Sequence, residues 1–242
     1  MKIRLASYNI LHCLDYRTWN TTRQIDYDAF GDAIRSLSPD VIGLNEVRDA
    51  GTSDGYDPQA RILSEKTGLP YFYFAQAIRF KGTNPYGNAL LSKYPIVSSE
   101  TIGIPDPDPK GYGGYYETRC VGKIKADLGG GRILTVLTSH FGLNPDEQEN
   151  ALNTVLGAIE PERCVLMGDF NVKPDNHVIA EIKKRMTDTA DAFSEPLLSI
   201  PSDSPHAKID YIFVSPDIRV LSADIPDLRV SDHRPHVAEI EI

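Results

Sequence analysis

Polar side chains suited to acid–base or metal chemistry adjoin the apolar runs of this sequence. Asp169 and Asn171 follow the run 163–168, and the pair Asp232-His233 precedes the last apolar run. Such residues pack poorly in a core, whereas strand ends are where α/β folds collect binding and catalytic groups. Carboxylate and amide oxygens beside an imidazole favour metal-assisted hydrolysis of a phosphate ester.

Further polar residues occupy the same kind of position. They are Asn9, Glu46, His140 and Asp210, each next to a strand-like run. Carboxylates are the ligands that Mg²⁺ or Mn²⁺ prefers, and an imidazole can move a proton near pH 7. Taken singly, each has a plainer interpretation, such as a solvated loop carboxylate for Glu46 or a turn former for Asn9. Their recurrence at strand ends of one polarity favours a shared site.

The elements that must position these residues alternate between strand and helix. No linker or repeat divides the 242 residues, which predicts one α/β domain over 1–242. Strands are predicted at about 2–9, 40–46, 70–76, 88–92, 96–103, 119–128, 132–139, 163–168, 209–214, 218–223 and 235–241. Helices are predicted at about 30–37, 57–66, 145–159 and 175–185. Two packed mixed sheets flanked by helices, a four-layer α/β sandwich, accommodate this order.

The composition is that of a globular protein with an acidic surface. Apolar residues make up 41% and charged residues 24%, which argues against a disordered chain. The formal net charge of −9 disfavours nonspecific binding to nucleic acid but leaves a nucleic-acid substrate open. No apolar run approaches the roughly 20 residues of a membrane helix.

Cysteine usage bears on the compartment. Cys13, Cys120 and Cys164 have no paired spacing, and two of them lie in strand-like runs. A disulfide framework is therefore not expected, and with no apolar leader at residue 1 we expect a cytoplasmic protein. The oligomeric state is left open.

The segment 105–116 combines prolines, glycines and three tyrosines. One interpretation is a surface connection between strands. The other is a loop whose aromatic rings contact an apolar or planar part of a substrate. The sequence favours neither.

Seven short motifs together resemble, in order, those of the endonuclease/exonuclease/phosphatase superfamily. The resemblance extends from residue 3 to residue 241, and the Gly-Asp-Phe-Asn and Ser-Asp-His motifs are its more specific parts. The motifs are Ser7-Tyr8-Asn9, Leu44-Asn45-Glu46-Val47, the stretch 87–95, Thr138-Ser139-His140-Phe141, Gly168-Asp169-Phe170-Asn171, Ile209-Asp210-Tyr211-Ile212 and Ser231-Asp232-His233. Membership implies the four-layer sandwich and a phosphoesterase that uses Mg²⁺ or Mn²⁺.

The resemblance also implies roles for individual residues. Glu46 would be the main metal ligand, with Asn9 beside it and Asp232 near the ion. Asp169 would position or deprotonate the attacking water, and Asn171 would hold that water or the phosphate. His140 would contact the phosphoryl oxygens. His233 would contact the scissile phosphate and would be oriented by Asp210. Arg119 is carried over as a phosphate contact, with an ordinary strand-edge cation as the plainer interpretation.

Two departures refine the expectation. Asn45 stands where the family usually has Gln, which predicts a weaker contact behind the metal ligand but leaves the ligand intact. Ser139-His140-Phe141, with Gly87-Asn88-Ala89, looks closer to phosphatases and phosphodiesterases than to the exonuclease III branch, and His140 is similar to deoxyribonuclease I. The expected function is hydrolysis of a phosphodiester or phosphomonoester. A DNA nuclease and a non-catalytic binding module are the alternatives.

Overall fold

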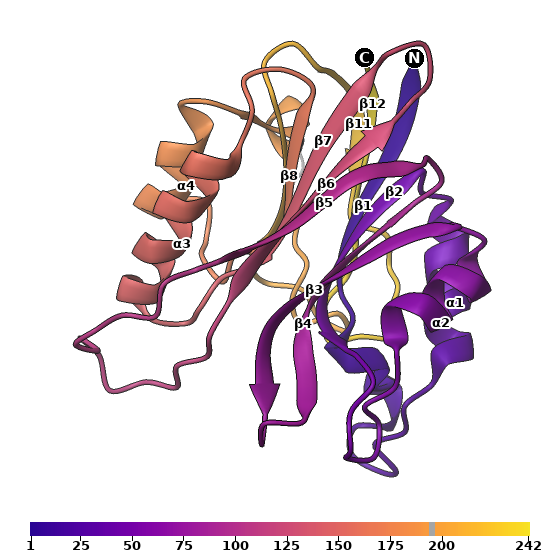
Figure 1. The fold of residues 1–242 in the computed structure, drawn as a ribbon, viewed down its shortest axis with the longest axis vertical. Helices are drawn as coiled ribbons and strands as arrows, with labels where there is room; N and C mark the ends of the chain where they lie inside the picture. The colour runs from indigo at the N-terminus through magenta and orange to yellow at the C-terminus, as the bar shows by residue number, and fades with distance from the viewer. Residues whose placement is uncertain (194–196) are drawn as a thin grey trace.

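Two mixed β-sheets pack face to face, and helices cover the outer face of each (Figure 1). The structure is a computed structural model that describes residues 1–193 and 197–242. Within those residues there are two six-stranded sheets. The layers are helices, sheet, sheet, helices, and the predicted four-layer α/β sandwich is confirmed.

The first sheet is built around the parallel pair β1 (Lys2–Asn9) and β2 (Val41–Arg48). Its order is β11-β12-β1-β2-β4-β3, and its other neighbours are antiparallel. The remaining strands are β3 (Tyr71–Phe80), β4 (Asn84–Ser92), β11 (Arg219–Asp224) and β12 (His236–Glu241). Because β1 and β2 run parallel, their carboxyl ends meet at one edge.

The second sheet repeats this plan around the parallel pair β7 (Ile133–His140) and β8 (Cys164–Asp169). Its order is β5-β6-β7-β8-β10-β9. The remaining strands are β5 (Ile96–Gly103), β6 (Cys120–Asp127), β9 (Thr187–Asp188) and β10 (Asp210–Val214). β6 and β7, both predicted as strands, form a hairpin whose turn passes through three glycines with positive φ, 129–131.

Over residues 1–193 and 197–242, four α-helices form the outer layers. In Figure 1, α1 (Tyr27–Leu37) and α2 (Gln59–Thr67) lie on one side of the sandwich, and α3 (Pro145–Ala158) and α4 (His177–Lys183) on the other. The start of α3 is the predicted one, since Asn144 and Glu147 form a reciprocal capping box around Pro145. Likewise α2 ends at Gly68, whose φ of 73° is left-handed.

Three apolar clusters hold the layers together. Leu5 and Met167 belong to the cluster between the sheets, Phe30 to the one beneath α1 and α2, and Val155 and Phe170 to the one beneath α3 and α4. Phe170 stacks on Phe141 with ring centroids 4.3 Å apart. This core lies directly behind the residues that follow β7 and β8, so it supports their positions.

The predicted elements are confirmed with three main differences. β3 runs on to Phe80, four residues beyond the predicted end at 76. β4 begins at Asn84 rather than near residue 88, because Asn84, Pro85 and Gly87 look like turn residues although the whole strand is buried. The two-residue strand β9 was not predicted.

The three cysteines are buried and free, in agreement with the expected absence of a disulfide framework. In the described part of the chain, no helix is long and apolar enough to cross a membrane.

Candidate active site

The predicted site residues meet at one end of the sandwich. β1, β2, β7 and β8 reach this end with their carboxyl termini, and β10 and β12, antiparallel to β8 and β1, reach it with their amino termini. The residues gathered there are Asn9, Glu46, Arg119, His140, Asp169, Asn171, Asp210, Asp232 and His233. The chain termini lie together at the far end (Figure 1).

Glu46 owes its direction to a β-bulge. Asn45 and Glu46 of β2 stand opposite the single Asn88 of β4, and Glu46 adopts a left-handed φ of 58°. A bulge re-aims a side chain at the cost of local strain, which non-glycine residues rarely accept without a functional reason. The carboxylate of Glu46 is turned toward Asn9, whose Nδ2 donates to Oε1 at 3.2 Å.

Asn9 links two carboxylates. Its Nδ2 also donates to Asp169 Oδ2 at 3.1 Å, and its Oδ1 accepts from the backbone N–H of Leu11 at 3.1 Å. The Leu11 contact fixes which way the amide points. Asn9 therefore holds Glu46 and Asp169 in place through its nitrogen.

His12, which is not among the predicted site residues, is a neighbour of Glu46. Its Nδ1 lies 3.8 Å from Glu46 Oε2, and its side chain is largely buried. Leu11, His12 and Cys13 all have left-handed φ angles, of 45°, 44° and 62°, and Gln59 Nε2 donates to the His12 carbonyl at 2.7 Å. The spacing Asn-x-x-His was the available signal, but it does not reveal a left-handed turn.

Burial alone would raise the pKa of Glu46, but the neighbouring His12 and Asn9 outweigh it and lower the pKa to about 2. Glu46 is therefore a carboxylate at neutral pH. Asp232 differs, because burial and the charge of Glu46 raise its pKa, while Ser231 Oγ donates to its Oδ1 at 3.1 Å. Two partly buried carboxylates that repel each other favour binding of a cation beside them.

Asn45 occupies the position where the family usually has Gln. Its Nδ2 donates to Asn88 Oδ1 at 2.8 Å and to the Ser139 carbonyl at 3.1 Å, and its Oδ1 accepts from the Asp169 backbone N–H at 3.0 Å. This buried amide therefore ties the bulge of the first sheet to the end of β8 in the second. The shorter side chain retains a full set of contacts here.

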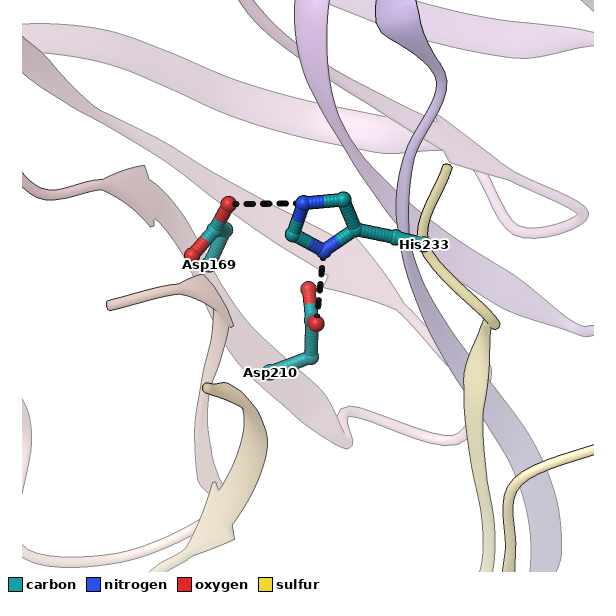
Figure 2. A group of neighbouring side chains, drawn as sticks. All are labelled: Asp169, Asp210 and His233. Carbon is teal, nitrogen blue, oxygen red and sulfur yellow. Dashed lines mark hydrogen bonds and ion pairs between the residues drawn. The ribbon is translucent and has the colours of Figure 1, made fainter. Parts of the chain in front are cut away.

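His233 lies between two aspartates (Figure 2). Its Nδ1 is 2.8 Å from Asp210 Oδ2, and its Nε2 is 3.6 Å from Asp169 Oδ2. Asp210 and Asp169 face each other across the β8–β10 ladder, and both are almost completely buried. The pairing register of β8 and β10 therefore brings the two carboxylates to one imidazole.

The protonation of this trio follows from its charges. Burial alone would lower the pKa of His233, but Asp210 and Asp169 outweigh it and raise the pKa to about 10. Burial, with the charge of Asp210, raises the pKa of Asp169, and His233 limits that rise. At neutral pH, His233 is an imidazolium, and Asp169 is a stronger base than an ordinary aspartate.

Ligand atoms of Asp169, Asp210 and His233 lie within 4.8 Å of one another, close enough to chelate a cation. Both ring nitrogens of His233 nevertheless face carboxylates, and a protonated ring has no lone pair for a metal. We interpret the trio as a proton-carrying group.

Ser199 is a second residue that sequence reasoning missed. It is buried, and its Oγ donates to Asp210 Oδ2 at 2.6 Å, beside the His233 contact. Two donors on one oxygen fix the Asp210 carboxylate, which in turn fixes the ring of His233. Ser199 lies outside the apolar runs and their ends, so no local pattern marked it.

His140 faces the same space from β7. Its Nε2 lies 3.1 Å from Asn171 Nδ2 and 3.5 Å from Asp169 Oδ2, and its Nδ1 lies 2.8 Å from Arg119 Nη1. Asn171 has a left-handed φ of 52°, and its Nδ2 also donates to the Phe141 carbonyl at 3.0 Å. Burial and the charge of Arg119 lower the pKa of His140 well below its ordinary value, so this histidine is neutral.

Gly168 allows β8 to bring Asp169 against β7. Its φ is 142°, and a Cβ there would lie 1.9 Å from the Ser139 carbonyl oxygen. We expect Gly168→Ala to lower the free energy of unfolding by roughly 3 kcal/mol or more, because the clash is with backbone. Urea unfolding followed by circular dichroism measures the change.

Gly157 is the matched control for that substitution. It lies in α3, and a Cβ there meets nothing within 4 Å. Gly157→Ala should leave stability unchanged or raise it by up to about 1 kcal/mol, because alanine favours the helix. Equal unfolding midpoints for the two variants would contradict the role of Gly168.

The loop 105–116 is anchored to the start of α3. The Gly111 N–H donates to Asp146 Oδ2 at 2.9 Å, and Tyr116 Oη donates to the same oxygen at 2.9 Å. Tyr112 and Tyr115 remain exposed, and Tyr115 Oη donates to Glu117 Oε2 at 3.1 Å. The loop therefore lies at the surface, and through Tyr115 it contacts Glu117.

Two packed mixed sheets flanked by helices, with carboxylates, amides and imidazoles converging at one end, define an α/β sandwich of the phosphoesterase type. The chain belongs to the Endonuclease/Exonuclease/phosphatase family, whose profile matches residues 6–233. Members of this family are hydrolases, phosphatases among them. No curated protein matches the sequence closely enough to serve as a relative.

Solved structures share the fold over essentially the whole chain. An endonuclease/exonuclease/phosphatase from Beutenbergia cavernae is 20% identical in sequence, with a TM-score of 0.80. The alignment covers 100% of this chain and 72% of the Beutenbergia chain. An endonuclease/exonuclease/phosphatase from Bacteroides vulgatus is 22% identical, with a TM-score of 0.78, and the alignment covers 100% of this chain and 99% of the other. A mannosyl-6-phosphatase from Bacteroides thetaiotaomicron is 17% identical with a TM-score of 0.77, covering 99% and 100%.

Proposed function

We propose that residues 1–242 form one catalytic domain that hydrolyses a phosphate ester by in-line attack of water, with Mg²⁺ or Mn²⁺ as cofactor. The observation that carries this proposal is the imidazolium of His233 held between Asp210 and Asp169, beside the carboxylate of Glu46. A buried cation, a buried base and an anionic ligand on one face are the components that water attack on a phosphoryl group requires.

The residues present fit a hard divalent cation. Glu46 is ionised, and its charge raises the pKa of Asp232 nearby, so the two carboxylates offer oxygen ligands and excess negative charge. Asn9 would hold Glu46 in place rather than add an oxygen, since its own oxygen accepts from Leu11. A bound cation would supply charge that polarises the phosphoryl oxygen and stabilises the leaving oxygen.

The remaining residues divide the proton transfers. Asp169, whose pKa is raised, would accept a proton from the attacking water. His233 would donate to the phosphoryl group or to the leaving oxygen, held by Asp210. His140 and Asn171, which lie next to each other, would contact the phosphoryl oxygens.

A small ester is the favoured substrate. The net charge of −9 disfavours a long polyanion, so a DNA nuclease is the second candidate. A non-catalytic binding module is less favoured, since every motif residue is present.

The test is hydrolysis of bis-p-nitrophenyl phosphate and of a panel of nucleotides, sugar phosphates, lipid head groups and abasic DNA. Turnover should require Mg²⁺ or Mn²⁺ and stop with chelator. Plasmid nicking at physiological salt should be weak beside cleavage of small esters. Turnover without a metal would refute the mechanism, and efficient nicking would favour the nuclease.

A further inference from the structure

Arg119 lies inside the site and has two partners there. Its side chain is 11% exposed, and its Nη1 is 2.8 Å from His140 Nδ1 and 2.8 Å from Glu117 Oε1. The side chain of Glu117 is 8% exposed. The guanidinium is therefore engaged by an imidazole and a carboxylate rather than by solvent.

The contact with Arg119 determines which nitrogen of His140 is protonated. A guanidinium only donates hydrogen bonds and keeps its charge in proteins. His140 Nδ1 must therefore offer a lone pair to Arg119, and since a neutral imidazole carries one proton, that proton lies on Nε2.

Asn171 competes for the opposite tautomer. Its Nδ2 lies 3.1 Å from His140 Nε2, a contact that would be a hydrogen bond only if Nε2 were the acceptor. The Asn171 amide is neutral, whereas a hydrogen bond from a charged group is roughly twice as strong. Arg119 therefore prevails, and Asp169 Oδ2, an acceptor 3.5 Å from His140 Nε2, favours the same tautomer. The N–H groups of His140 and Asn171 do not pair with each other and face the same space.

We propose that Arg119 and Glu117 are positioning residues that keep the proton of His140 on Nε2, so that His140 and Asn171 present two N–H donors to one phosphoryl oxygen. The role of these donors rests on the phosphoesterase function proposed above. Donors fixed before the substrate arrives need no reorganisation during the reaction. Arg119, which the resemblance implied as a phosphate contact, would act through His140 instead.

Glu117 is itself held from the loop side. Its Oε2 accepts from Tyr115 Oη at 3.1 Å, and its backbone N–H donates to Glu147 Oε1 at 3.1 Å, at the first turn of α3. The loop 105–116 and α3 thus hold Glu117, Glu117 holds Arg119, and Arg119 holds His140. The lowered pKa of His140 agrees with a neutral ring, which the tautomer requires.

The test is the ¹⁵N NMR spectrum of the histidine side chains in the full-length protein at neutral pH, without substrate. His140→Gln assigns the resonances by their loss. The wild type should show a protonated Nε2 and an unprotonated Nδ1. In Arg119→Leu the proton should move to Nδ1, because Asn171 then becomes the donor to Nε2. Glu117→Gln should shift it partly in the same direction.

Arg119→Lys is the conservative variant, since an ammonium group also only donates, and it should keep the Nε2 tautomer. Arg132→Leu, on the exposed β6–β7 turn, is the matched control and should change nothing. Arg119→Leu should also lower kcat by about 10- to 100-fold, the range for residues that orient a functional histidine. Arg119→Lys should restore most of it.

The outcomes separate this proposal from its rivals. A protonated Nδ1 in the wild type, or an unchanged tautomer in Arg119→Leu, overturns it. A raised KM and weaker binding of inorganic phosphate with an unchanged tautomer would make Arg119 a direct phosphate contact. If Arg119→Leu does not fold, the ¹⁵N resonances of His140 in Glu117→Gln test the proposal instead. If the wild type hydrolyses no ester, the proposed function fails while the tautomer result stands.

Discussion

Replacing His233 with alanine should lower kcat on a phosphodiester by about 10²- to 10⁴-fold, the usual contribution of a positioned acid or base. The imidazolium is the one positive charge that Asp210 and Asp169 hold between them, and neither can replace it as a donor. Steady-state kinetics at saturating Mg²⁺ measures the loss. The loss of rate should be larger for a substrate with an alkyl leaving group than for one with a p-nitrophenyl leaving group. An alkoxide is the stronger base, so its departure depends more on protonation.

His177 is the matched control. It is an exposed histidine on α4 that pairs with Glu149 and with none of the site residues named above. His177→Ala should keep the wild-type rate. A His233→Ala enzyme within threefold of the wild type would remove His233 from the mechanism, whatever the effect on KM.

Replacing Glu46 with glutamine should abolish metal-dependent turnover and weaken Mn²⁺ binding. The change keeps the shape of the side chain but removes a carboxylate that its neighbours hold ionised. Mn²⁺ affinity should fall by more than roughly 10- to 100-fold, which is the usual effect of removing a residue that only orients a metal ligand. Mn²⁺ titration by electron paramagnetic resonance measures it without any substrate.

Glu160 provides the control for Glu46. Neighbouring lysines also lower its pKa to about 2, but it pairs with Lys123 and Lys125 away from the site. Glu160→Gln should bind Mn²⁺ like the wild type. Equal Mn²⁺ affinity of Glu46→Gln and the wild type would place the cation elsewhere, with the Asp169–Asp210–His233 group as the next candidate.

Much of the fold was predictable because its signals are local. The start of α3 depends on residues 144–147, the β6–β7 turn on three adjacent glycines, and the end of α2 on Gly68. A few neighbouring residues suffice for each such feature. β4 was less predictable, because its turn-like residues are strand residues buried by both neighbouring strands.

The amino-acid sequence by itself determined the order of strands and helices and the polar residues at the strand ends. Those residues in turn indicated the family. Only the tertiary structure decided the bulge that turns Glu46, the left-handed turn that brings His12 beside it, and the partner of Arg119. The physical reason is distance along the chain: Asn45 meets Asp169 across 124 residues, so sheet register and packing decide which side chains converge.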